Sequence, residues 1–103
     1  MEIILPVPTH VFTVYTKTDC FYCDKVKQLL KESGNDTRLV PCDSYLTEHR
    51  DEFLAVMDQR TGTIHRTFPF VFHGTRFIGG CDDTEKYLLS QRKEKEITFD
   101  DEF

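Results

Sequence analysis

The sequence contains no long apolar stretch and no surplus of basic residues. No segment approaches the roughly 20 consecutive apolar residues that a membrane-spanning helix requires. The 13 lysines and arginines are outnumbered by 18 aspartates and glutamates, which gives a formal net charge of −5. Nucleic-acid binding depends on clustered lysine and arginine side chains that neutralise phosphates. We therefore expect no membrane and no nucleic-acid partner.

An export signal is also missing from the start of the sequence. The first residues have no basic region, and Pro6 and Pro8 interrupt a very short apolar run. We therefore expect a reducing compartment, with the cytoplasm as the default. In such compartments cysteines are more often catalytic or metal-binding than structural. The four cysteines are therefore the first candidates for chemistry.

Glycine, proline and tryptophan are scarce, at five, four and zero residues. We find no internal repeat, and no low-complexity segment except the charged C-terminus. The 103 residues are 39% hydrophobic and include nine phenylalanines, which is enough for one core without disulfide cross-links. The sequence therefore predicts one domain over residues 10–93, preceded by a lead-in at 1–9 and followed by an acidic tail at 94–103.

The pattern of apolar residues predicts the element order β-α-β-α-β-β-α. Strands are expected at residues 10–16, 37–42, 70–72 and 75–78, and helices at 21–33, 47–60 and from Asp82 onward. Asp19 is the expected cap of the first helix, and Pro41 places the second strand at a sheet edge or ends it. A strand–helix–strand unit is right-handed and parallel, and the closing hairpin extends the same sheet. The order therefore predicts an α/β fold in which helices flank a four-stranded mixed sheet.

Two cysteines separated by two residues, Cys20 and Cys23, lie where the first strand gives way to the first helix. Unpaired N–H groups and the helix dipole favour a thiolate at that point, and Lys17 adds positive charge. Both effects lower the pKa of the Cys20 thiol from its ordinary value of about 8.5. Cys23 lies one turn inside the helix, where it can attack a mixed disulfide on Cys20. The pair is therefore a candidate redox site that cycles between dithiol and disulfide.

Two other interpretations of this pair stay open from the residues alone. The cysteines can be buried and inert, or they can supply two of the four ligands of a zinc ion. The other two thiols, Cys42 and Cys81, lack near neighbours, and none of the four histidines falls into ligand spacing. We therefore favour redox chemistry, expect no metal, and interpret the thiols of Cys42 and Cys81 as bystanders.

Two further motifs follow later in the chain. In Thr67-Phe68-Pro69, a cis peptide bond before Pro69 would hold the Phe68 backbone beside the cysteines, ready to pair with an extended thiol substrate. The alternative there is a plain strand start. In Gly79-Gly80-Cys81-Asp82-Asp83, glycine backbone precedes an acidic helix start, which is typical of a ligand-binding backbone nest or of an ordinary helix start. Together with the cysteine pair, these motifs indicate a ligand site.

With these motifs in family order, the segment from His10 to Arg92 resembles a dithiol glutaredoxin. The resemblance rests on Tyr15-Thr16-Lys17 before Cys20-Phe21-Tyr22-Cys23, on Thr67-Phe68-Pro69, and on Gly79-Gly80-Cys81-Asp82-Asp83. It implies a thioredoxin-like fold and a glutathione-dependent oxidoreductase that reduces protein disulfides and glutathione mixed disulfides. Cys20 would be its nucleophile and Cys23 its resolving thiol. We expect the protein to be a monomer.

The resemblance also implies a set of residues that bind glutathione, the co-substrate. A basic edge would pair with a glutathione carboxylate, a backbone segment would hold the cysteinyl part, and an acidic helix start would hold the γ-glutamyl end. The basic edge is Lys17 with Arg66, and the backbone segment is Thr67-Phe68-Pro69. The acidic helix start is Gly80, Cys81 and Asp82, and Tyr22 would line the groove. Two features depart from the family pattern: Phe21 stands where the commonest dithiol members have proline, and residues 61–66 form a longer connection.

Two further expectations come from resemblance. Some glutaredoxins hold a [2Fe–2S] cluster between two subunits, with glutathione as an extra ligand, and this is the alternative function. Residues 96–103 carry Phe99 and Phe103 among acidic residues. They resemble the acidic, Phe-terminated tail with which small subunits of class I ribonucleotide reductases dock onto their large subunits. The large subunit of ribonucleotide reductase is therefore a candidate partner, to which the protein would donate electrons. The alternative that stays open is a frayed, solvated acidic tail without a partner.

Overall fold

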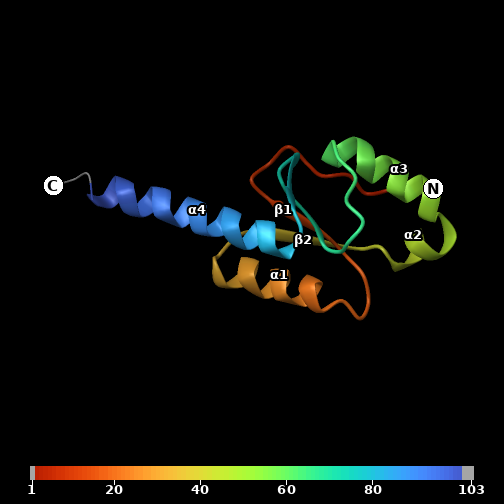
Figure 1. Cartoon of the computed structure of the whole chain (residues 1–103), viewed down its shortest axis with the longest axis horizontal. Helices are drawn as coiled ribbons and strands as arrows, with labels where there is room; N and C mark the ends of the chain where they lie inside the picture. The colour runs from red at the N-terminus through yellow and green to blue at the C-terminus, as the bar shows by residue number, and fades with distance from the viewer. Residues whose placement is uncertain (1, 101–103) are drawn as a thin grey trace.

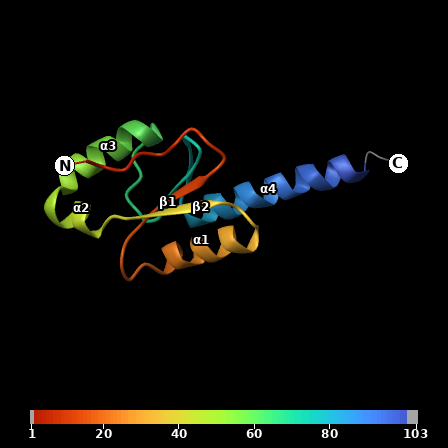
Figure 2. The same ribbon diagram turned by 180° about the vertical axis from the view of Figure 1, so that it is seen from behind.

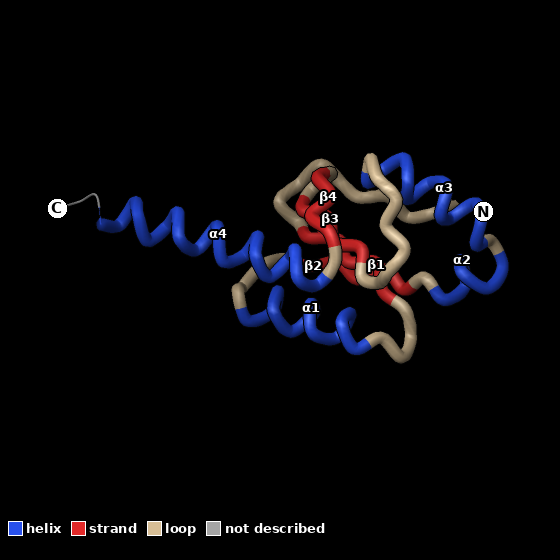
Figure 3. Tube along the Cα trace, viewed as in Figure 1, coloured by secondary structure: helices blue, strands red, loops and turns tan. Residues whose placement is uncertain are grey.

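A central strand, β1 (Phe12–Thr16), runs through the middle of the computed structural model, and all five of its residues are buried. The structure describes the backbone of residues 2–100 and the side chains of residues 2–91. After β1 the chain forms α1 (Phe21–Glu32), β2 (Thr37–Pro41), α2 (Asp43–Glu48), α3 (Arg50–Thr61), β3 (Phe70–His73), β4 (Arg76–Gly79) and α4 (Cys81–Asp100). Figure 1 labels the helices, and Figure 3 separates helices from strands by colour.

The four strands form one sheet in the order β2-β1-β3-β4. β1 pairs in parallel with β2 and antiparallel with β3, and β3 pairs antiparallel with β4. Val14 at the centre lies opposite Leu39 on one side and opposite Val71 on the other. β2 is an edge strand, as Pro41 predicted. The predicted four-stranded mixed sheet is therefore confirmed.

Helices cover both faces of this sheet (Figures 1 and 2). Because neighbouring residues of a strand point to opposite faces, Phe12 and Val14 pack on one side and Tyr15 on the other. The first side is covered by α1 and α4, and the second by α2 and α3. The buried residues of the second side are Tyr15, Val40, Cys42, Tyr45, Phe53, Met57, Phe70 and Phe72. The predicted layers, with helices on both faces, are confirmed.

The segment between β2 and β3 forms two helices where the sequence predicted one at 47–60. His49 separates α2 from α3 with φ −140° and ψ 43°, outside the helical region. Only Tyr45 of α2 is buried, and six residues are too few to display helical periodicity. Gly62 ends α3, as predicted, in the left-handed region at φ 72°. The observed order is therefore β-α-β-α-α-β-β-α.

The lead-in before β1 is tied to the core by three hydrogen bonds. The Tyr15 hydroxyl donates to the Ile4 carbonyl at 2.6 Å, and the Ile4 N–H donates to the Tyr45 hydroxyl at 3.1 Å. The Arg38 guanidinium donates to the Leu5 carbonyl at 2.6 Å. The first residues therefore lie against the folded unit rather than apart from it.

The last helix, α4, continues to Asp100, so the backbone of residues 94–100 of the expected tail is helical. Figures 1 and 2 show α4 running outward from the body of the molecule. The rest of that tail, residues 101–103, and the side chains from Arg92 onward lie outside the described residues. Among the helices of residues 2–100, none is both long and apolar enough to cross a membrane.

Candidate active site

The cysteine pair lies at the start of α1. Cys20 occupies the N-cap position in an extended conformation, and its Sγ accepts the Cys23 N–H at 3.2 Å. The expectation that Asp19 caps the helix is therefore wrong; Asp19 lies in the preceding turn with a φ of 56°. A disulfide joins Cys20 to Cys23, and their Cα atoms are 5.3 Å apart. Cys20 is partly exposed and Cys23 is fully buried, so an incoming thiol or disulfide meets the sulfur of Cys20.

Asp43, at the start of α2, fixes the turn that leads to Cys20. The Thr18 N–H donates to Asp43 Oδ1 at 2.9 Å, and the Cys42 N–H donates to the Thr16 carbonyl at 2.8 Å. Hydrogen bonds from Thr18, together with the positive charge of Lys17, hold the pKa of the Asp43 carboxyl below its ordinary value. Sequence reasoning missed this role because it placed Asp43 in a loop. The turn before the disulfide is thereby joined to the opposite layer of helices.

The second motif lies close to the first. The peptide bond between Phe68 and Pro69 is cis, as the motif predicted. The Phe68 ring stacks parallel to Phe53 at a centroid distance of 6.4 Å and meets Phe70 edge to face at 5.1 Å. The Lys17 ammonium lies 5.6 Å from the centroid of the Phe68 ring. Lys17 therefore connects the turn before Cys20 to the Thr67-Phe68-Pro69 segment.

The three motifs meet in a groove of about 370 Å³. Its lining residues are Tyr22, His65, Thr67, Phe68, Gly80, Cys81, Asp82 and Asp83. Six of them belong to the predicted binding set. Of the remaining predicted residues, Lys17 lies over Phe68 and Pro69 follows it, so both adjoin the groove.

The turn into α4 needs glycine at one position. Gly79 has a φ of 132°, and a Cβ there would collide with the side chain of Asp83. The Thr84 hydroxyl donates to the Gly80 carbonyl at 2.7 Å, within the first turn of α4. Unpaired backbone N–H groups at a helix start favour anionic groups. The acidic side chains of Asp82 and Asp83 lie at the same place and favour a cation.

Arg66 does not line the groove. Its guanidinium donates two hydrogen bonds to the Asp58 carboxylate of α3, at 2.6 and 2.9 Å. These bonds hold the pKa of the Asp58 carboxyl below its ordinary value. The long connection at residues 61–66 thus places Arg66 against α3, and its predicted contact with a carboxylate ligand stays a prediction.

His65 lines the groove although the sequence did not single it out. Its Nε2 atom lies 3.3 Å from the Pro69 carbonyl oxygen. The ring meets Phe70 and Phe77 edge to face, at centroid distances of 4.8 and 5.3 Å. His65 therefore links the Pro69 segment to the sheet. Its place two residues before Thr67 is the signal that could have identified it.

The remaining thiols are buried. Burial raises the pKa of the Cys42 thiol to about 12, and it also raises the pKa of Cys81. Cys42 is fully buried just after β2 rather than partly buried within it. Both thiols are therefore held in the neutral form, which is a poor nucleophile. Among the side chains of residues 2–91, no three of His, Cys, Asp or Glu are grouped so as to hold a metal ion.

Comparison with known proteins gives consistent results. The family model named Glutaredoxin matches residues 12–78. A glutaredoxin of Ricinus communis is 37% identical over 78 residues, which cover 76% of this chain and 72% of that protein. A buckwheat glutaredoxin–glutathione complex is similar with a TM-score of 0.62 at 34% identity, over 84% of this chain and 73% of that one. Glutaredoxin 1 of Francisella tularensis, complexed with cacodylate, has the same fold: its TM-score is 0.64 at 24% identity, over 85% of this chain and 96% of that one.

Family and chemistry agree at the start of α1. A disulfide between a partly exposed and a buried cysteine is the oxidised half of a dithiol–disulfide couple, which exchanges with external thiols through a mixed disulfide. This couple lies within the matched residues. The chain therefore belongs to the glutaredoxin family, and it is a thiol–disulfide oxidoreductase with a thioredoxin-like fold.

Proposed function

We propose that the protein uses glutathione as electron donor and reduces both protein disulfides and glutathione mixed disulfides. The observation that carries this proposal is the groove beside the disulfide, which has opposite charges around it. Lys17 lies over Phe68, whereas Asp82 and Asp83 open α4. Glutathione carries two carboxylates and one ammonium, so such charges orient it. The buckwheat relative, which was solved in complex with glutathione, supports the same ligand class.

We assign each part of the groove a contact with glutathione. Lys17 pairs with one carboxylate, and the first N–H groups of α4, with Asp82, receive the γ-glutamyl carboxylate and ammonium. The backbone of Phe68 pairs with the cysteinyl part as an added strand does, and the Tyr22 ring covers it. This arrangement brings the glutathione sulfur to Cys20.

The reaction on a glutathione mixed disulfide needs one cysteine. The Cys20 thiolate attacks the glutathione sulfur, the protein thiolate leaves, and Cys20 becomes bonded to glutathione. A second glutathione thiolate attacks that bond, which forms glutathione disulfide and restores the Cys20 thiolate. With a protein disulfide, the Cys20 thiolate first attacks one substrate sulfur and forms a mixed disulfide with the substrate protein. Cys23 then attacks the Cys20 sulfur of that mixed disulfide. This releases the reduced substrate and leaves the Cys20–Cys23 disulfide, which two glutathione molecules then reduce.

A coupled assay tests this proposal. Glutathione, glutathione reductase and NADPH are supplied with a glutathionylated peptide or a protein disulfide, and thioredoxin reductase replaces the glutathione system in a parallel reaction. We expect Cys23→Ser to retain deglutathionylation and to lose most reduction of protein disulfides, whereas Cys20→Ser loses both. Turnover by Cys20→Ser above a few per cent of wild type would show that Cys20 is not the nucleophile. Turnover with thioredoxin reductase, and none with glutathione and glutathione reductase, would show that glutathione is not the donor.

We also propose that the protein works as a monomer in the cytoplasm and supplies electrons to the large subunit of ribonucleotide reductase. The support for this partner lies in the sequence of residues 96–103, where Phe99 and Phe103 stand among acidic residues. Two aromatic residues at this spacing share a helix face, and a tethered reductant reacts at a raised effective concentration.

Deletion of residues 96–103 tests the proposed tether. We expect the truncated protein to reduce small disulfides at the wild-type rate and to support ribonucleotide reduction more slowly. Full-length protein in excess should compete with the small subunit for its docking site. If truncated and full-length protein support ribonucleotide reduction at equal rates, and full-length protein does not compete with the small subunit, this role for the segment is excluded.

A further inference from the structure

Phe21 directly follows the reactive Cys20 and has no part in the core. It is the first residue of α1, and its side chain is 73% exposed. The face of α1 that packs on the sheet carries Cys23, Val26 and Leu30. An aromatic ring left in water forgoes the stabilisation that burial would give. The fold therefore provides no reason for a phenylalanine at this position.

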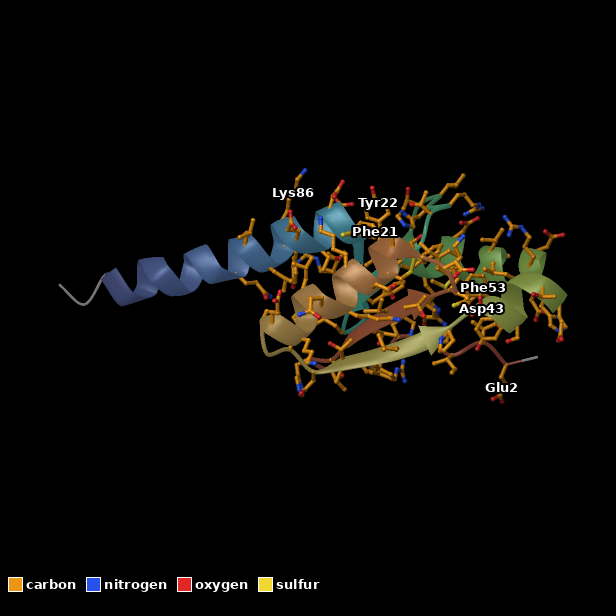
Figure 4. All side chains as sticks on the ribbon, turned by 90° about the horizontal axis from the view of Figure 1, so that it is seen from below. Glu2, Phe21, Tyr22, Asp43, Phe53 and Lys86 are labelled. Atoms are coloured by element: carbon orange, nitrogen blue, oxygen red, sulfur yellow. A yellow bond between two sulfur atoms is a disulfide. The ribbon has the colours of Figure 1, made fainter. Side chains whose placement is uncertain are left out.

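Phe21 forms an aromatic pair with its neighbour Tyr22. The two rings meet edge to face at a centroid distance of 5.3 Å, and Tyr22 is itself 54% exposed. Figure 4 shows the two side chains together at the first turn of α1. Because Tyr22 also lines the groove, the aromatic pair joins Phe21 to the groove surface.

Covalent geometry determines what can cover this surface during reaction. In a mixed disulfide on Cys20, the substrate cysteine has its Cα about 4.4–6.8 Å from the Cys20 Cα. The next substrate residue lies about 3.8 Å further along its chain. A side chain adjacent to the substrate cysteine therefore comes within reach of Phe21, the residue adjacent to Cys20. A small disulfide such as hydroxyethyl disulfide has no side chain at that place.

We propose that Phe21 determines substrate specificity by binding an aromatic or large aliphatic side chain next to the reducible cysteine of a protein disulfide. This inference rests on the proposed reduction of protein disulfides and names the substrate class that the site prefers. The contact forms as the Cys20 thiolate bonds to the substrate sulfur and the partner sulfur leaves as a thiolate. Cys23 then displaces the substrate thiolate, and the two electrons of the dithiol have passed to the substrate. Phe21 takes no part in these bond changes and acts by holding the substrate.

The test uses two disulfide-linked peptides that differ in one residue, phenylalanine or serine, beside the cysteine. The reduced protein is mixed with each peptide without glutathione, and the released peptide thiol is measured over a single turnover. We expect the wild type to react about tenfold faster with the phenylalanine peptide, the scale of burying part of an aromatic side chain. Phe21→Ala should lose that preference and keep its rate on the serine peptide and on hydroxyethyl disulfide within about twofold. Phe21→Leu should retain most of the preference for the phenylalanine peptide.

Leu39→Ala is the matched control, because Leu39 is 46% exposed on the edge strand β2, outside the groove. Its rates should equal those of the wild type. Equal wild-type rates on both peptides, or an equal loss by Phe21→Ala on all three disulfides, would overturn the inference. A dimer in analytical ultracentrifugation that Phe21→Ala abolishes would also overturn it, since a second copy would then cover the aromatic pair. The glutathione-coupled assay reports separately on the electron donor, so its failure would leave a peptide preference intact.

Discussion

Lys17 is the single basic residue that connects the turn before Cys20 to the groove. Its ammonium lies over Phe68, and its charge contributes to the low pKa of the Asp43 carboxyl. The same charge is available to a carboxylate of bound glutathione and to the Cys20 thiolate. With Arg66 engaged by Asp58, Lys17 is the cation that the groove offers from this side.

We expect Lys17→Ala to raise the KM for glutathione by at least about tenfold, because it removes one charge-assisted hydrogen bond, worth about 1.5–3 kcal/mol. The coupled assay at varied glutathione concentration measures this change. Lys86→Ala, on exposed α4 surface (Figure 4), is the control for loss of a positive charge and should leave the KM unchanged. A similar rise in both variants would show that net charge, rather than the position of Lys17, is responsible.

At the residue scale, the sequence predicted those parts of the site whose residues lie close together along the chain. Cys20 and Cys23 lie three positions apart at a helix start, so their proximity needs no knowledge of the rest of the fold. Arg66 and His65 differ, because their directions depend on how the connection after α3 folds. That path is fixed by the pairing of Arg66 with Asp58, a contact between two elements that local pattern does not reveal.

At the scale of elements, Phe53 of α3 joins the helical layer to the groove. It is fully buried, and its ring stacks on Tyr45 of α2 at 5.3 Å and on Phe68 at 6.4 Å. Asp43, at the start of α2 in the same layer, holds the turn before Cys20; Figure 4 labels both residues. The layer of α2 and α3 therefore supports two sides of the site without contributing a reacting atom.

We expect Phe53→Ala to lower the free energy of unfolding by about 3–5 kcal/mol, the usual cost of truncating a buried phenylalanine. Urea unfolding followed by circular dichroism measures the loss. Phe53→Leu should lose much less, and Leu89→Ala, 51% exposed on α4, should stay within about 0.5 kcal/mol of wild type. We also expect the KM for glutathione to rise in Phe53→Leu, since Phe68 loses its stacking partner. A wild-type KM for glutathione in Phe53→Leu would show that Phe68 is held in place by its other contacts.

The elements themselves were predictable where apolar residues repeat over a sufficient length. All four strands and three of the four helices follow the expected order, and α4 begins at Cys81, one residue before Asp82. The break at His49 was missed because the six residues of α2 are too few to display a helical pattern of their own. Asp19 was mistaken for the cap because side-chain type favours aspartate there, whereas Cys20 holds the extended conformation that a cap requires.

At the scale of the whole molecule, buried acidic groups make stability depend on alkaline pH, and Tyr15 and Cys42 are the two whose pKa values are raised most. Burial raises the pKa of the Tyr15 hydroxyl, and it raises that of the Cys42 thiol from 9.0 to about 12. Both groups stay protonated in the folded protein after the unfolded chain has begun to lose their protons. The folded state then binds more protons than the unfolded state, so the free energy of unfolding falls as pH rises.

We expect the stability to be constant with respect to these two groups below about pH 8.5 and to fall progressively between about pH 9 and 12. Urea unfolding of the oxidised protein at several pH values in this range measures the slope. Cys42→Ala should show a shallower slope than wild type, whatever its stability at neutral pH, because one of the two groups is gone. Identical slopes in the two proteins would show that Cys42 does not contribute.

The unequal burial of the four cysteines has a practical consequence for finding the protein's clients. Cys23, Cys42 and Cys81 are buried, and only Cys20 is presented to the surroundings. A Cys23→Ser variant thus carries one accessible sulfur, and its other two thiols, of Cys42 and Cys81, are buried and held in the neutral form, so neither is a good nucleophile for releasing what becomes bonded to Cys20. Used as bait in a cell extract, it should retain each client as a one-to-one covalent adduct at a single known position. Mass spectrometry of those adducts would then identify each client protein and the cysteine through which it is bonded to Cys20.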